Sequence, residues 1–481
     1  MRLIEYEFFM KILSYSGCRN MTRSSEPTYR RVAVIGGGPG GLAMAKALAI
    51  EPATFDRLAL FERRDKIGGV WYYSEEKKIA RPSVPSCHRN SKDVFEDIAN
   101  EERPFLSSMY DNLETNLPGK MMEYNNVHFA NQSKPFLNRQ EVLQYVQKYA
   151  QTIPSSVQRL LNSNVVELRK DQGVWNLKYE DMKTKEFKTD HFDAVVVANG
   201  HFNVPFIPDV EGLEEWSKKD PSSITHARYF VRDTDFKDKN VLVIGNKSSG
   251  SDISMQLSVS AKKVFVSSNE KEFIDNHNVT HIGIVKKYDY ENGRSVETVD
   301  GDIINSIDSV IFCTGYLYDV PFLKTYENIL GDGRQIYDLY KQIFYLYDPS
   351  LAFIGLPKDV VPMPLSESQA AIVARVYSGR LKLPSVEEMK GDYEKELRER
   401  GKGTSFHKLP FPLDGNYCRE LQKIIDDANI GTVGLRAPIW DDAKMDLRSK
   451  VFQLKAKRME KVAEHSNKLR QNGEPYRLLN K

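Results

Sequence analysis

Short apolar runs that end at glycines are the most regular pattern along the chain. Residues 32–35 form one such run, and the glycines that follow lead into the helix-favouring residues 42–49. The same order returns later: residues 241–244 are apolar, Gly245 follows, and residues 252–257 continue as a helix. A buried strand that runs through a glycine turn into a helix is typical of a parallel α/β sheet. The pattern therefore predicts two α/β units in one chain.

Two further apolar runs bracket the second unit. Residues 194–198 end at Asn199-Gly200, and residues 309–313 end at Thr314-Gly315. Alone, each could be an ordinary strand and loop, but as a pair they mark where the chain crosses between domains. We expect an α/β fold with two dinucleotide-binding (Rossmann-like) domains, the smaller inserted in the larger. The expected bounds are 1–28 for an N-terminal extension, 29–203 and 309–481 for the larger domain with a C-terminal helical tail, and 204–308 for the inserted domain.

Four segments lie outside this framework. Residues 74–109 are polar and broken by prolines, and so long a loop is either a lid over a site or a surface decoration. Residues 297–305 predict a hairpin that turns at Asp300-Gly301. The tail from about residue 436 is charged and helical, which favours a solvated helix face. Residues 1–28 could be an amphipathic cap, a weak targeting segment or an upstream extension.

Composition and charge narrow the functional classes. The 481 residues are 41% hydrophobic and 28% charged, as in a soluble globular protein, and the net charge of +2 argues against a nucleic acid partner. The sequence has no run of about 20 apolar residues, so it predicts no membrane-spanning helix. We expect a cytoplasmic protein, with loose attachment to the endoplasmic reticulum as the alternative. The cysteines have no redox or metal-ligand spacing, which predicts neither a disulfide framework nor a metal site. They are Cys18, Cys87, Cys313 and Cys418.

The first glycine turn has the full pattern of a dinucleotide site. Gly36 makes the tight turn, Gly38 lets the backbone approach a pyrophosphate, and Gly41 lets helix and strand pack closely. The helix N-terminus adds free N–H groups and a partial positive charge. Glu62 ends the next strand, 21 residues after Gly41, where an acidic residue binds ribose hydroxyls.

The second turn departs from this pattern at its middle position. Gly245 and Gly250 match, but Lys247 places a Cβ where backbone and ligand approach each other. Ser248 and Ser249 can still donate hydrogen bonds to phosphate. The turn is a working site, a weakened one, or a turn that binds no dinucleotide. Two dinucleotide folds in one chain favour a flavoprotein reduced by a nicotinamide.

The chain resembles the flavin-containing monooxygenases, most closely the fungal branch with thiol-oxidising members, from about Arg31 to Trp440. The matching segments are GGGPGG (36–41), GGVW (68–71), YDNLETNLPGKMM (110–122), ANGHFNVPFIP (198–208), CTGYLYDVPF (313–322) and LAFIGLPKDVVPMPLSESQAAIVARVYSG (351–379).

The resemblance implies FAD on the first turn and NADPH on the second. It makes Asn116 the candidate catalytic residue, facing the flavin ring and NADP, although such an asparagine could be a plain turn residue. Trp71 could equally be a residue of the hydrophobic core, and Gln369 could be an ordinary polar residue on a helix face. The implied FAD residues are Gly36, Gly38, Gly40, Gly41, Glu62, Gly69, Val70, Trp71, Asn116 and Gln369, and the implied NADPH residues are Gly245, Asn246, Ser248, Ser249 and Gly250.

Two details of the resemblance are weaker. For the 2′-phosphate of NADPH, Ser267, Ser268 and Lys271 are available after the next strand, but Glu270 would repel it. Of the family's interdomain signature only His226 and Phe230 match, and we expect His226 to be structural. The Trp-Pro pair that Baeyer–Villiger relatives carry after this histidine is absent.

The implied activity is an FAD-dependent, NADPH-consuming monooxygenation. One oxygen atom of O2 would pass through a flavin C(4a)-hydroperoxide to a soft nucleophile: a thiol, sulfide or amine. The alternatives are an N-hydroxylase or Baeyer–Villiger-type relative, a disulfide reductase, which would need a dithiol, and a catalytically impaired flavin-binding protein. The expected partners are O2 and one small nucleophile, and a homodimer is left open.

Overall fold

The computed structural model describes residues 27–73, 80–89, 94–95, 105–130, 134–269 and 276–479. Its larger sheet has seven strands in the order β20-β21-β22-β9-β1-β2-β5, of which the last five are mutually parallel and the first two form an antiparallel edge hairpin. Their bounds are β1 Arg31–Ile35, β2 Arg57–Phe61, β5 Val157–Leu160, β9 Ala194–Val197, β20 Leu339–Tyr340, β21 Phe344–Tyr345 and β22 Leu351–Phe353.

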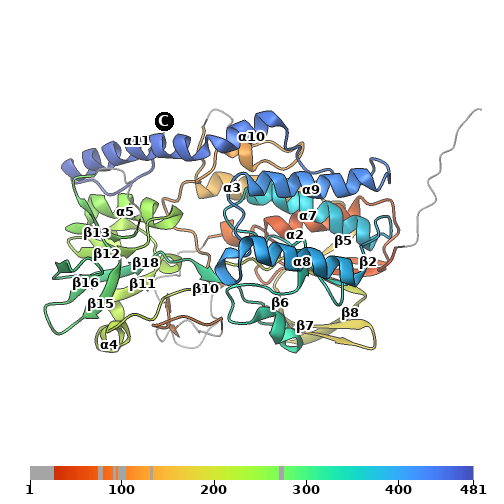
Figure 1. Cartoon of the computed structure of the whole chain (residues 1–481), viewed down its shortest axis with the longest axis horizontal. Helices are drawn as coiled ribbons and strands as arrows, with labels where there is room; N and C mark the ends of the chain where they lie inside the picture. The colour runs from red at the N-terminus through yellow and green to blue at the C-terminus, as the bar shows by residue number, and fades with distance from the viewer. Residues whose placement is uncertain are drawn as a thin grey trace, which may run out of the picture.

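Both faces of this sheet are covered, which explains why its central strands are continuous apolar runs. Along β1, Val32 and Val34 face a helical layer, while Ala33 and Ile35 face a second, antiparallel sheet. The helical layer contains α2 (Pro39–Ala49), α3 (Arg139–Gln151), α7 (Pro362–Tyr377) and α9 (Leu413–Asp427), and the antiparallel sheet contains β6 (Ser163–Asp171), β7 (Val174–Asp181) and β8 (Phe187–Phe192). Figure 1 shows these layers in its right half.

The second domain repeats this three-layer plan on a smaller scale. Its sheet has the order β11-β18-β12-β13-β14, all parallel, with α5 on one face and α4 with a three-stranded antiparallel sheet on the other. The hairpin predicted at Asp300-Gly301 is confirmed as β16–β17. The bounds are β11 Ile224–His226, β12 Asn240–Ile244, β13 Lys263–Ser267, β14 Val279–Ile282, β18 Ser309–Phe312, α4 Leu213–Lys219, α5 Ser248–Ser260, β15 Val285–Asp289, β16 Ser295–Thr298 and β17 Ile303–Ile304. The predicted α/β class with two such domains is confirmed.

A two-stranded connector joins the domains. β10 (Val204–Pro205) carries the chain out of the larger domain, and it pairs with β19 (Tyr316–Leu317), which carries it back. The boundary expected between residues 308 and 309 needs correction, because β18 lies between β11 and β12 in the second sheet. The return to the larger domain therefore begins after Phe312.

The described part of the loop expected at 74–109 is attached to this connector. Ser86 and Ile207 exchange backbone hydrogen bonds of 3.0 Å, and β3 (Ala80–Arg81) pairs with β4 (Val94–Phe95). Residues 74–79, 90–93 and 96–104 of that loop lie outside the described residues, as do residues 1–26 of the expected extension.

The C-terminal helices complete the molecule. α6 (Glu327–Leu330) and α8 (Val386–Arg400) belong to the larger domain, and α10 (Asp442–Ser449) leads into α11 (Val451–Gln471). α11 lies along α5 of the second domain (Figure 1), where Met459 and Val462 pack against Met255 and Val259. The expected solvated face is therefore only one side of this helix. Of the helices in the described ranges, none is long and apolar enough to cross a membrane.

Candidate functional site

The first glycine turn is closed by backbone contacts that exclude side chains. Gly36 has φ +116°, and a Cβ there would lie 2.3 Å from the carbonyl oxygen of Ala198. A Cβ on Gly41 would lie 1.8 Å from the carbonyl oxygen of Gly36. Glycine is therefore required at both positions, and α2 begins directly at the ends of β1 and β9.

A second glycine loop touches the first. A Cβ on Gly69, which has φ +55°, would lie 2.6 Å from Cα of Gly38, and one on Gly38 would lie 3.3 Å from Cα of Gly69. Gly38 is the N-cap of α2 and supplies no side chain to its first amides. These amides and the helix dipole suit a pyrophosphate. The contact also explains why GGVW accompanies the first turn in this sequence.

Glu62 lies at the end of β2, as predicted, and is 6% exposed. Its Oε2 accepts a hydrogen bond from the Gly37 amide at 2.7 Å, and its Oε1 accepts one from the Arg64 amide at 3.0 Å. Arg64 in turn donates to the carbonyl oxygens of Gly69 and Tyr72 at 2.8 and 3.0 Å. A buried carboxylate beside a glycine turn fits the ribose of a dinucleotide.

Cations surround this carboxylate. Burial and the charges of Arg64 and Arg228 together lower the pKa of Arg63 to about 10, although the Glu62 carboxylate raises it. Several cations beside one acid give the site a net positive charge, which suits phosphate groups. None of these arginines is among the predicted site residues, although two arginines directly after the ribose-binding acid are a readable signal.

The second turn repeats the contacts of the first. Gly245 has φ +96°, and a Cβ there would lie 2.9 Å from the carbonyl oxygen of Cys313. A Cβ on Gly250 would lie 1.8 Å from the carbonyl oxygen of Gly245, the same approach as Gly41 makes to Gly36. The strand, turn and helix that a dinucleotide needs are thus all present in the second domain.

Lys247 fits this turn without strain. It is the N-cap of α5 with φ −75° and ψ −164°, close to the −85° and −176° of Gly38 at the same place in the first turn. This is extended backbone that any L-residue adopts. Its side chain is exposed, as is Ser248, while Asn246 and Ser249 are half-buried.

The structure changes the expectation for the 2′-phosphate. Ser267 is 4% exposed, and its hydroxyl donates to the Gly283 carbonyl at 3.0 Å and accepts from the Val285 amide at 3.2 Å. Because this hydroxyl is buried and ties β13 to the turn between β14 and β15, the expectation that Ser267 is available to a phosphate is wrong. Ser268 follows it directly, and Glu270 and Lys271 lie outside the described residues.

Asn116 is exposed at the end of a firmly held loop. Thr115, one residue earlier, donates its amide to the Leu137 carbonyl at 2.8 Å, and its hydroxyl accepts from the Leu137 amide at 3.0 Å. The backbone is therefore fixed while the Asn116 side chain stays accessible to a ligand.

Gln369 is fully buried on α7. Its Oε1 accepts from the Gly355 amide at 2.8 Å, and its Nε2 donates to the Tyr417 hydroxyl at 2.9 Å. It thus holds the turn after β22, and its contact with flavin stays a prediction. Trp71 is half-buried against the larger core, and the Val70 carbonyl accepts from the Ser107 hydroxyl.

His226 has the structural role expected of it. Its Nε2 donates to the Gly315 carbonyl at 3.0 Å and its Nδ1 accepts from the Arg228 amide at 3.1 Å. Burial lowers its pKa to about 3, so the ring is neutral and joins β11 to the connector.

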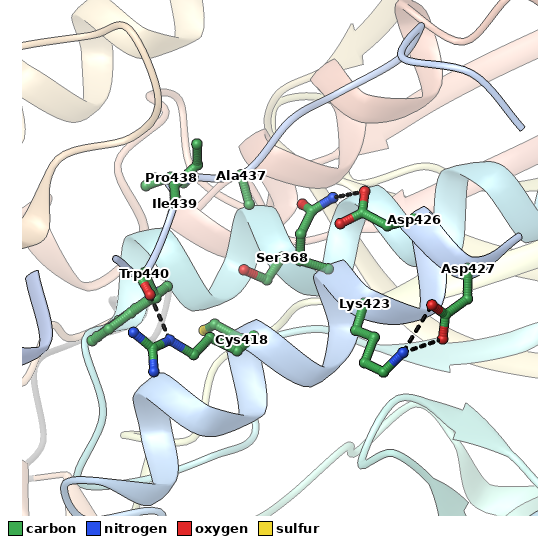
Figure 2. A pocket seen from close by; sticks show the side chains of 11 residues that line it. Ser368, Cys418, Lys423, Asp426, Asp427, Ala437, Pro438, Ile439 and Trp440 are labelled. Atoms are coloured by element: carbon green, nitrogen blue, oxygen red, sulfur yellow. Dashed lines mark hydrogen bonds and ion pairs between the residues drawn. The ribbon is translucent and has the colours of Figure 1, made fainter. Parts of the chain in front are cut away.

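The cysteines and possible metal ligands of the described ranges bear on the expectations for disulfides and metals. Cys87, Cys313 and Cys418 are free thiols, and burial raises the pKa of Cys418 to about 12. Within the described ranges no three His, Cys, Asp or Glu side chains could share a metal ion. A cavity of about 350 Å³ lies between α9 and residues 437–440 (Figure 2), but cations that line it already have partners: Lys423 pairs with Asp427, and Arg419 with Asp442.

Comparison with known proteins agrees with these two turns. A family model described as flavin-binding monooxygenase-like matches residues 29–290 and 291–432. The thiol-specific monooxygenase of Saccharomyces cerevisiae is 30% identical over 465 residues, covering 93% of this chain and 98% of that protein. The flavin-containing monooxygenase ustF2 of Aspergillus flavus is 27% identical, covering 89% and 98%. The structure of S-allyl-L-cysteine S-oxygenase from Allium sativum superposes with a TM-score of 0.74 at 27% identity, covering 92% of this chain and 98% of that one. The chain belongs to the flavin-binding monooxygenase-like family.

Proposed function

We propose that the chain is an FAD-dependent, NADPH-consuming monooxygenase that transfers one oxygen atom from O2 to a soft nucleophile, with thiols and sulfides as its main substrates. The observation that carries the proposal is the pair of glycine turns with the same backbone contacts, one in each domain. Two of the similar proteins above are named for oxidation at sulfur, which supports this choice over amines.

The chain's own residues bind and orient the two nucleotides. The uncapped first turn of α2 and the buried Glu62 fit the FAD pyrophosphate and ribose, and the first turn of α5 fits the NADPH pyrophosphate. When bound, FAD supplies the hydride acceptance and oxygen activation that no side chain here provides. Asn116, exposed on its fixed loop, is the side chain that we place beside the reacting groups.

Two of the rival functions, a disulfide reductase and an impaired flavin-binding protein, have little support. A disulfide reductase needs a reactive dithiol, whereas burial raises the pKa of both Cys313 and Cys418 and the described cysteines are free thiols. The impaired-binding alternative depends on Lys247, whose backbone matches that of Gly38.

The test is an anaerobic titration of the purified yellow protein with NADPH. We expect the oxidised-flavin absorbance to bleach, and then to return on addition of O2 with one equivalent of oxygenated thiol when cysteamine is present. Gly250→Ala is the control, because its Cβ would clash with Gly245 while leaving the FAD turn intact. Bound FAD that NADPH does not bleach would contradict the NADPH site, and bleaching without thiol oxygenation would contradict the substrate.

A further inference from the structure

Residues 110–116 form a joint between the two domains. Tyr110 is 4% exposed, and its hydroxyl donates to Oδ2 of Asp252 at 2.5 Å. Asp252 lies in the first turns of α5, the helix whose N-terminus faces the proposed NADPH pyrophosphate. Burial raises the pKa of Asp252, the Lys455 charge and the Tyr110 hydrogen bond lower it, and the net pKa is about 6.

The next two residues continue this contact. Asp111 pairs with Arg232 at 2.8 Å, and its amide donates to the Val231 carbonyl at 3.1 Å. The carbonyl of Asn112 accepts from Nε2 of Gln256, on α5, at 3.1 Å. Three consecutive residues of the larger domain therefore bind the second domain.

The other end of the joint is held by α11. Glu114 is 5% exposed, and its Oε1 lies 2.6 Å from Nη2 of Arg458, which is 8% exposed. Lys455 lies 3.4 Å from the same carboxylate and donates to the Thr115 carbonyl at 3.1 Å. These contacts hold the loop immediately before Asn116.

α11 also holds α5 along its length. Besides the packing of Met459 and Val462, Nη1 of Arg470 donates to the carbonyls of Ser258, Val259 and Ala261 at 3.0, 3.1 and 2.7 Å, at the C-terminal end of α5. One helix thus contacts both the loop that carries Asn116 and the helix that would bind NADPH.

We propose that Tyr110 and Glu114 are positioning residues: with Asp252 and Arg458 as partners, they fix Asn116 relative to the phosphate-binding end of α5. The inference rests on the proposed function for its catalytic consequence only. Because the joint is anchored on both sides of Leu113, release of either anchor lets the phosphate-binding end of α5 move relative to Asn116, whose own backbone stays held at Thr115. Water and O2 then meet a site whose parts are no longer aligned, and NADPH oxidation yields hydrogen peroxide rather than oxygenated thiol.

The test compares Tyr110→Phe and Glu114→Gln, which keep side-chain shape, with Asp414→Asn. Asp414 is a matched control, because its carboxylate lies 2.7 Å from Nε of Arg448 and is equally buried, but joins α9 to α10 away from the joint. We expect amide hydrogen exchange over residues 111–117 of the apoprotein to accelerate at least tenfold in both joint variants and not in the control.

The second readout uses the FAD-loaded enzyme. We expect unchanged FAD content and an at least fivefold rise in peroxide released per NADPH in the joint variants, approaching the value for Asn116→Ala. Glu114→Asp, which keeps the charge, should restore part of the coupling. Unchanged exchange over 111–117, or faster exchange with unchanged coupling, would overturn the inference. If the wild type consumes no NADPH, the proposed function fails, while the exchange comparison still decides whether the joint holds the loop.

Discussion

Lys247 is where the second glycine turn departs from the first, and its backbone shows that lysine fits this position without strain. A position that needs glycine for a positive φ would be strained by lysine, but this one has φ −75°. What lysine changes is the charge at the start of α5, where the helix already favours anions. An exposed ammonium group beside a bound pyrophosphate adds to that attraction.

We therefore expect Lys247→Ala to bind NADPH three- to tenfold more weakly, a loss of about 1 kcal/mol. Lys247→Arg should bind like the wild type, because it keeps the charge. Isothermal titration calorimetry with NADP⁺ would measure the affinity of the wild type and of both variants. Tighter binding by the alanine variant would show that the long side chain obstructs the site.

Glu367 gives a second prediction for a single residue. Its Oε1 accepts from the Tyr149 hydroxyl and its Oε2 from the Asn125 amide, both at 2.7 Å, and burial raises its pKa to about 7 from 4.5. A raised pKa in the folded state means that this group favours folding most below pH 4.5 and loses that contribution as pH rises through about 7.

Glu367→Gln removes the charge and keeps one partner for each amide atom. We expect the variant to match the wild type at pH 5 and to exceed its stability at pH 8.5 by up to about 3 kcal/mol. Urea unfolding at the two pH values would measure the difference. An equal gain in the free energy of unfolding at pH 5 and pH 8.5 would show that titration of Glu367 is not the cause.

Among elements, the contact between the two glycine loops is the feature on which we expect the proposed FAD site to depend. Gly69→Ala places a Cβ 2.6 Å from Cα of Gly38 in a loop with φ +55°. We expect purified Gly69→Ala to retain less than a tenth of the wild-type FAD, measured by absorbance. Gly173→Ala is the matched control: its φ is +84°, but nothing lies within 4 Å of the added Cβ, so it should bind FAD normally.

The elements that the sequence predicted correctly are those defined by local pattern. Both strand-turn-helix units and the hairpin at Asp300-Gly301 need only a few adjacent residues to be recognised. β18 was assigned to the wrong domain because an apolar run does not say which sheet it joins. The pair of Glu114 and Arg458, 344 residues apart, has no local signal at all, since two common charged residues become partners only through the fold.

At the scale of the whole molecule, three structures among the described residues connect the domains: the β10–β19 connector, the joint of residues 110–116, and α11. The connector is short and lets the chain cross twice, whereas α11 covers α5 and reaches the loop before Asn116. A connector alone allows one domain to rotate against the other, as is common for domains joined by small interfaces. The packing of α11 is what we expect to restrict that rotation.

Val462→Asp tests this expectation, because it puts a charge into the apolar contact between α11 and α5, where Val462 is 4% exposed. Burying an unpaired carboxylate costs several kcal/mol. We therefore expect α11 to detach from α5 while the cores of the two domains stay folded. We expect normal FAD content, a larger radius of gyration by X-ray scattering, and anaerobic reduction by NADPH at least tenfold slower. Lys461→Asp changes the exposed neighbour and should resemble the wild type. If α11 is released and reduction keeps its rate, the connector and the joint align the two nucleotide sites without α11, and α11 only holds the loop that carries Asn116.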